Sequence, residues 1–94
     1  METKLFEAEF LRRLNAMRIA FEILPKGIKV KADKGWWLVE VKEPIVGDNR
    51  KCLVTLQTIE KRHVAGTTIP VTTTRFHKPC TSYYLLQYII GHKF

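Results

Sequence analysis

The chain has 94 residues, 46% of them hydrophobic, and a formal net charge of +7. This length fits one domain rather than two, so we expect residues 1–94 to fold as a single unit. The hydrophobic share can build a core, which excludes wholesale disorder. The sequence shows no apolar run near the roughly 20 residues of a spanning helix, and its N-terminus does not resemble a signal peptide. We therefore expect a cytoplasmic protein with no membrane partner.

The positive charge is distributed unevenly along the chain. Residues 1–22 carry four bases and four acids, so they are neutral, and the whole excess of +7 lies in residues 23–94. Bases concentrated on one surface can bind a polyanion, whereas a diffuse excess mainly aids solubility. The placement of the bases in the fold therefore matters more than their number.

The N-terminal segment predicts an amphipathic helix over about residues 3–22. Thr3 is a candidate N-cap, and apolar residues recur at spacings of three and four, the period of one helical face. This stripe comprises Phe6, Phe10, Leu14, Met17 and Phe21. We interpret the stripe as a core contact. The alternative is an earlier end near Arg18 with residues 20–24 extended, because Ile19 would otherwise face outward.

Two segments with alternating apolar and polar residues, 28–33 and 36–42, predict a β-hairpin. We expect Lys34 and Gly35 to form its two-residue loop, since a glycine suits such a turn. The resulting register sorts apolar and polar residues onto opposite faces of both strands. The hairpin is the clearest local signal in the sequence.

This register assigns different environments to two adjacent tryptophans. Trp37 is predicted to point into the core, and Trp36 is predicted to lie on the outer face of the hairpin. The same register places Lys29 directly opposite Glu40, a favourable cross-strand pair. The outer face should therefore be basic and carry an aromatic residue.

A third strand is predicted over residues 50–59, after a bulge or turn around Pro44 and a turn at residues 47–49. Alternation indicates which of its side chains point inward. The predicted inward residues are Cys52, Val54 and Leu56.

The remainder of the chain is less regular. We predict a mobile loop over residues 60–68, an exposed or edge strand over 69–76 and a turn over 77–82. Residues 83–90 form an apolar run that we favour as a strand, because isoleucine and tyrosine suit strands. A helix capped by Thr81 is the alternative.

Together these elements predict an α+β fold with an N-terminal helix packed on an antiparallel sheet of four or five strands. The β-rich, basic portion would span about residues 26–90. Only one helix is expected, so one face of the sheet should remain open or form a homodimer contact.

A basic surface beside an aromatic residue is the first functional candidate. Cations neutralise phosphates and release counterions, and an exposed indole can stack on an unpaired base. We therefore predict a small accessory or regulatory protein that binds nucleic acid, with RNA or single-stranded DNA favoured. The predicted contact residues are Lys29, Lys31, Lys34, Trp36, Leu38, Arg50, Lys51, Lys61, Arg62, Arg75 and Lys78. The alternative is a solvated basic face with Trp36 covered by a loop, since no established nucleic-acid-binding motif is present.

A small inhibitor or adaptor that docks on an acidic protein or a nucleoprotein complex is the second functional hypothesis. Trp36, Leu38 and Leu53, with some of the C-terminal tyrosines, would form an apolar centre on the outer face. The bases would form a charged rim around that centre.

Metal binding and catalysis are the remaining candidates, and we favour neither. The potential metal ligands are Cys52, His63, His77 and Cys80. Their spacing lacks the paired knuckles of a zinc site, so we expect reduced thiols, surface histidines and no cofactor. No nucleophile elbow, phosphate-binding glycine loop or pair of catalytic carboxylates is present, and we expect a protein that is not an enzyme.

Overall fold

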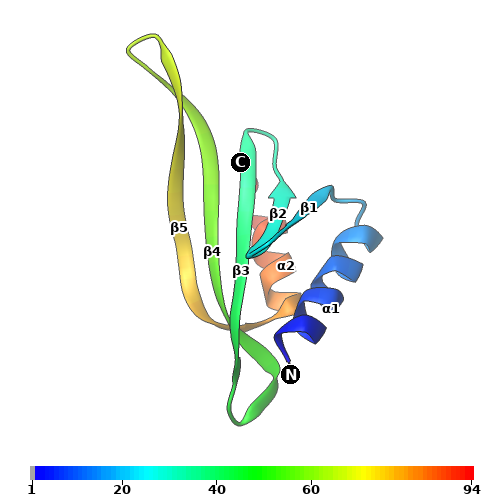
Figure 1. Ribbon diagram of the computed structural model, residues 1–94. Helices are drawn as coiled ribbons and strands as arrows, with labels where there is room; N and C mark the ends of the chain where they lie inside the picture. The colour runs from blue at the N-terminus through cyan, green and yellow to red at the C-terminus, as the bar shows by residue number, and fades with distance from the viewer. Residues whose placement is uncertain (1) are drawn as a thin grey trace.

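The computed structural model describes residues 2–94, which form two helices and a five-stranded antiparallel sheet (Figure 1). The elements are α1 (Thr3–Ala16), β1 (Phe21–Leu24), β2 (Gly27–Lys31), β3 (Gly35–Ile45), β4 (Asp48–Val64), β5 (Thr67–Thr81) and α2 (Ser82–Gly91). The strands follow their sequence order across the sheet, so each pairs with the one before it. The predicted α+β fold, with its N-terminal helix on an antiparallel sheet, is confirmed.

Helix α1 ends at Ala16, well before residue 22, so the longer predicted helix is wrong and the earlier end is correct. Arg18 adopts a φ of 56°, in the left-handed region that commonly follows the end of a helix. The chain then turns into β1. A continuous helix could not place both Ile19 and Phe21 against the core, whereas the turn and short strand do so.

The start of α1 also differs from the prediction. Thr3 is the first helical residue, and Glu2 occupies the N-cap position without a side-chain hydrogen bond. The stripe itself is correct over its first three residues, Phe6, Phe10 and Leu14, which are fully buried. Met17 lies beyond the helix and is 52% exposed.

The β2–β3 loop lies one residue earlier than predicted. The N–H of Ala32 donates to the Gly35 carbonyl oxygen at 3.0 Å, which leaves Asp33 and Lys34 as the loop. Gly35 instead begins β3, where an added Cβ would overlap the Ile59 carbonyl oxygen of β4. This glycine is therefore required for the close approach of two strands rather than for the turn.

Moving the loop by one residue shifts the strand register by two. A shift of two preserves the faces of every side chain, because alternation has a period of two. Trp37 is buried and Trp36 lies on the opposite face, as predicted. The predicted pairing of Lys29 with Glu40 is wrong, since Lys29 faces Leu38.

A bulge interrupts β3 near Pro44, and the third predicted strand is present as the middle of the longer β4. Residues 60–68 are not a loop. They complete β4 and begin β5, with a two-residue turn at Ala65 and Gly66, both of which have positive φ. This is the hairpin geometry that matches the natural twist of the strands.

Strand β5 is an edge strand, as predicted for residues 69–76, and it continues through residues 77–81, where a turn was expected. Pro70 and Pro79 both lie within it. An edge strand tolerates proline, because an N–H that would point away from the sheet can be absent without loss of a ladder hydrogen bond.

Residues 83–90 are helical, so the favoured strand is wrong and the alternative is correct. Thr81 caps α2 by accepting a hydrogen bond from the Tyr84 N–H at 3.0 Å. Leu85, Leu86 and Ile89 recur at helical spacing and are buried.

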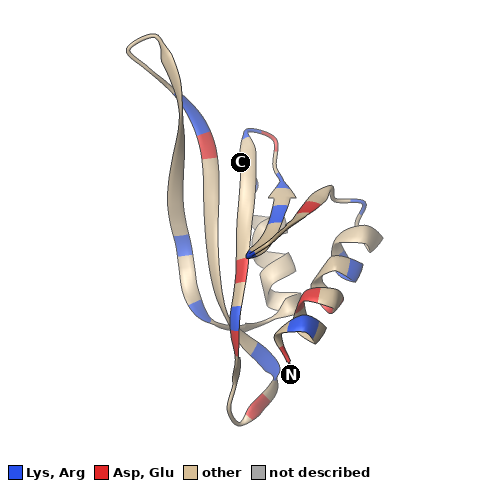
Figure 2. Ribbon diagram, viewed as in Figure 1, with Lys and Arg blue, Asp and Glu red and all other residues tan. Residues whose placement is uncertain are grey.

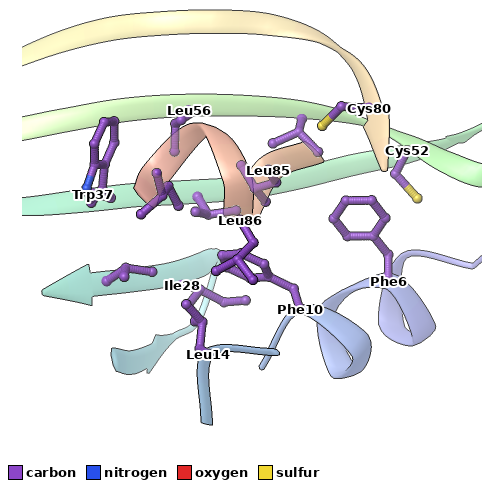
Figure 3. Close-up of a cluster of buried hydrophobic side chains, with 14 residues drawn as sticks. Phe6, Phe10, Leu14, Ile28, Trp37, Cys52, Leu56, Cys80, Leu85 and Leu86 are labelled. Carbon is purple, nitrogen blue, oxygen red and sulfur yellow. The ribbon is translucent and has the colours of Figure 1, made fainter. Parts of the chain in front are cut away.

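The core lies between the helices and one face of the sheet (Figure 3). Trp37 is its largest side chain, and the rings of Tyr88 and Phe94 meet it edge-on at centroid distances of 6.2 and 5.1 Å. The Phe94 carbonyl oxygen also accepts a hydrogen bond from the Lys34 N–H. Phe94 thus packs on the core and holds the β2–β3 loop.

A polar network joins the two helices. Ser82 donates a hydrogen bond to the Glu9 carboxylate at 2.7 Å, and Arg13 donates to the same carboxylate at 2.9 Å. Arg13 also donates to the Ser82 hydroxyl at 3.2 Å. The Ser82 and Arg13 hydrogen bonds lower the pKa of Glu9.

Candidate nucleic-acid interface

The other face of the sheet carries no helix within residues 2–94, and Trp36 lies on this open face. Lys31 is directly opposite Trp36, and Lys29 lies two residues earlier on the same face of β2. Their ammonium groups are 5.7 and 4.5 Å from the centroid of the indole ring. Two cations therefore contact an aromatic ring that is only half-buried.

A hollow of about 420 Å³ opens beside this ring between β2, the β2–β3 loop and the β4–β5 hairpin. Ile59 and Pro70 form part of its wall. Its lysines are Lys29, Lys31, Lys34 and Lys61. We call these four lysines and Trp36 the Trp36 surface. Residues far apart in the chain thus form one concave, cationic site.

The lysines of the Trp36 surface are not neutralised by acids. Within residues 2–94, none of the four lies within 4.0 Å of a carboxylate oxygen. Asp33, in the loop, is the one acidic residue among the described residues that line the hollow. Glu22 of β1 faces Lys29 across the strand pair without forming an ion pair with it, so the cations are available to an anionic partner.

Several other predicted contact residues are paired with acids and lie elsewhere. Arg50 and Lys51 approach Asp48 at 3.9 and 3.8 Å, at the end of β4 away from the Trp36 surface. Arg62 lies 3.3 Å from Glu60 on the opposite face of the hairpin from Lys61. The sequence did not distinguish these bases from the lysines around Trp36.

Arg75 and Lys78 lie on the helix-covered side of the sheet. A bulge in β5 leaves Arg75 outside the register with β4, and its guanidinium lies 5.5 Å from the Trp37 ring centroid. Lys78 donates a hydrogen bond to the Tyr84 hydroxyl at 2.7 Å, which raises the pKa of Lys78. The tyrosines of α2 accordingly lie on this side as well, not on the outer face where some were expected. No sequence signal marked the bulge.

The open face also presents polar and apolar groups beyond the Trp36 surface. Leu38 lies opposite Lys29, as its predicted outer position requires. Cross-strand hydrogen bonds join Thr55 to His77 at 2.6 Å and Gln57 to Thr74 at 3.3 Å. These hydroxyl and amide groups can exchange internal hydrogen bonds for contacts with a ligand.

The potential metal ligands do not converge. His63 is hydrogen-bonded to Thr68 near the β4–β5 turn, far along the strand from Cys52. Cys52 and Cys80 are cross-strand neighbours buried in the core, and burial raises the pKa of Cys80 to about 11. Among residues 2–94, no three His, Cys, Asp or Glu side chains are grouped so that they could hold a metal ion.

Comparison with known proteins found no matching family model, no similar curated protein and no similar solved structure. None of the helices in residues 2–94 has the length and apolar character needed to cross a membrane.

Proposed function

We propose that this protein is an accessory or regulatory protein that binds single-stranded nucleic acid, RNA or DNA, through the Trp36 surface. The observation that carries the proposal is the half-buried indole on an uncovered sheet face, surrounded by lysines without acidic partners. A concave basic site with an aromatic platform is a common means of holding unpaired nucleotides.

In this proposal the lysines contact phosphates and Trp36 stacks on a base. The Lys29 ammonium group lies over the indole, 4.5 Å from the ring centroid. A base that stacks on this ring displaces the ammonium group, and the flexible lysine stem lets it move to a neighbouring phosphate. The same cations thus contact the ring in this structure and would neutralise phosphate charge in the complex.

The distribution of acids favours one end of the open face. Glu40 and Glu43 lie on this face toward the β3–β4 turn, opposite Thr55 and Leu53, and Glu22 lies at the outer edge of the sheet in β1, opposite Lys29. Carboxylates repel phosphates, so we expect the strand to follow the lysine end of the face and to avoid the acidic end.

Fluorescence polarisation with a labelled single-stranded oligonucleotide tests the proposal. We expect the affinity to fall steeply as salt rises, and Trp36→Ala to weaken binding by about 1–3 kcal/mol. Unlabelled heparin serves as the nonspecific polyanion control. Binding that is insensitive to salt, or equal in Trp36→Ala and the wild type, would contradict the proposal.

A second candidate function is that of an inhibitor or adaptor docking on an acidic protein or nucleoprotein complex. It is favoured by Leu38 and Leu53, which lie half-buried on the open face with Trp36 and could form an apolar centre inside a basic rim. A homodimer through this face would use the same residues. A partner that survives nuclease treatment in a pull-down, or a dimer in sedimentation, would favour these alternatives over nucleic acid.

A further inference from the structure

The β4–β5 hairpin extends past the rest of the molecule as an arm, which we define as residues 61–70 (Figure 1). Every residue of the arm is exposed, and the molecule measures 50 Å in its long direction against 25 Å in the other two. The strands remain paired up to Val64 and Thr67 at the tip. The arm is therefore a two-stranded ribbon rather than an irregular loop.

The arm continues the Trp36 surface. Lys61 and Pro70 face each other at its base and line the hollow beside Trp36. Alternation places His63 on the same face as Lys61, two residues nearer the tip. A ligand that occupies the hollow would therefore meet the base of the arm directly.

The arm contains bases and no acids. Lys61, Arg62 and His63 follow one another on β4, and residues 61–70 include neither aspartate nor glutamate. Figure 2 shows the basic segment of β4 beyond the acidic position at its base, which is Glu60. Arg62 lies 3.3 Å from Glu60 in a partly exposed ion pair, which a phosphate can replace, so the charge of the arm is complementary to a polyanion.

The arm exposes apolar side chains that no part of the core covers, Val64 beside the turn at the tip and Ile69 opposite Arg62, next to the base. Val64 is 52% exposed and Ile69 is 39% exposed. Side chains of this kind can contact thymine methyl groups in the major groove. Basic and apolar groups thus occur on one narrow projection.

The dimensions of the arm match one type of nucleic-acid groove. Paired strands lie about 4.8 Å apart and rise about 3.3 Å per residue, so the arm is roughly 15 Å long. The major groove of B-form DNA is about 12 Å wide and admits a two-stranded ribbon, whereas the major groove of A-form RNA is too narrow for side chains to read.

We propose that the arm enters the major groove of a DNA duplex that adjoins the single strand held by the Trp36 surface. The preferred substrate class is then a junction between single-stranded and double-stranded DNA. This inference rests on the proposed function, because the Trp36 surface must hold the unpaired strand.

The test compares the affinities of the full chain for matched oligonucleotides. The substrates are a DNA duplex with a single-stranded overhang, a single strand with the same number of phosphates, a blunt duplex, and the RNA counterpart of the junction. We expect the wild type to bind the DNA junction about tenfold more tightly than the single strand, because the arm adds phosphate contacts.

Two variants reduce, to different extents, the contribution of the arm to the preference for the DNA junction. Arg62→Gln should reduce the junction preference by about threefold. It should also make the fall of log affinity with log salt concentration less steep, by the amount that one phosphate contact contributes. Replacing residues 62–69 by Asn-Gly joins Lys61 to Pro70 with a two-residue turn and should abolish the preference. Neither change should alter binding of the single strand.

Arg50→Gln is the matched control. Like Arg62, Arg50 lies on β4 two residues after its acidic partner, but it lies at the opposite end of the strand. An equal loss of junction preference in both glutamine variants would overturn the inference, since the loss would then reflect total charge.

The remaining outcomes separate the two proposals. A protein that binds single strands through Trp36 but shows no junction preference would overturn the role of the arm and leave the proposed function intact. An equal preference for the RNA junction would overturn the entry of the arm into a DNA groove. A wild type that binds none of the oligonucleotides at low salt would overturn the proposed function and the inference with it.

Discussion

The two faces of the sheet are built from the same strands and differ in almost every physical property. The helix-covered face contains Trp37 and the fully buried residues of the core. The open face contains Trp36, half-buried and in contact with Lys29 and Lys31. Two identical side chains, adjacent in the chain, thus receive a structural and a proposed functional role solely through the alternation of the strand.

The largest expected effect separates the two tryptophans. Trp37→Ala should lower the free energy of unfolding by about 3–5 kcal/mol, because it leaves a cavity among buried rings, whereas Trp36→Ala should cost less than about 1 kcal/mol. Urea denaturation measures both values. Similar losses of unfolding free energy in the two variants would show that Trp36 stabilises the fold as much as Trp37 does.

The polar network between the helices gives the next effect. Glu9→Gln should destabilise the protein by about 1–2 kcal/mol, because it removes a charged acceptor of hydrogen bonds from Ser82 and Arg13. Glu43→Gln, on the open face, is the control and should be nearly neutral.

The same network predicts a dependence of stability on pH. The pKa of Glu9 is lower in the folded protein than in the unfolded chain. Its contribution is therefore complete at neutral pH and is lost as the pH falls through the pKa of the unfolded chain and then through the lower pKa of the folded protein. The difference in stability between wild type and Glu9→Gln should shrink in urea titrations at acidic pH, and a constant difference would contradict the assignment.

The cap of α2 should have a smaller effect. Thr81→Ala removes the acceptor for the Tyr84 N–H and should cost about 1 kcal/mol, while Thr81→Ser should retain most of the stability. Thermal unfolding measures both. Equal melting temperatures for the alanine variant and the wild type would indicate that the cap contributes little to the covered face.

The smallest effect on stability is expected on the open face. Lys31→Gln should change the free energy of unfolding by less than about 0.5 kcal/mol. It should nevertheless make the affinity for the oligonucleotide less dependent on salt concentration, by the amount that one phosphate contact contributes. Lys42→Gln is the control, because Lys42 pairs with Glu40 outside the Trp36 surface. If the wild type, Lys31→Gln and Lys42→Gln show the same dependence of affinity on salt, Lys31 does not contact a phosphate.

The sequence by itself determined which side chains share a face. The helical spacing of Phe6, Phe10 and Leu14 identified the buried stripe of α1, and strand alternation assigned Trp36 and Trp37 to opposite faces. The face assignment survived a wrong loop position, because the register error was an even number of residues. Short-range periodicity depends only on backbone geometry, which is local.

Tertiary structure decided where elements end and which lysine and arginine side chains come together. The apolar run of residues 83–90 suits a strand or a helix, and it is helical because Leu85 and Ile89 then cover the sheet together with α1. Likewise, Lys61 joins Lys29 beside Trp36, while the β5 bulge directs Arg75 to the covered side. These outcomes depend on contacts between residues far apart in the chain, and no local pattern encodes them.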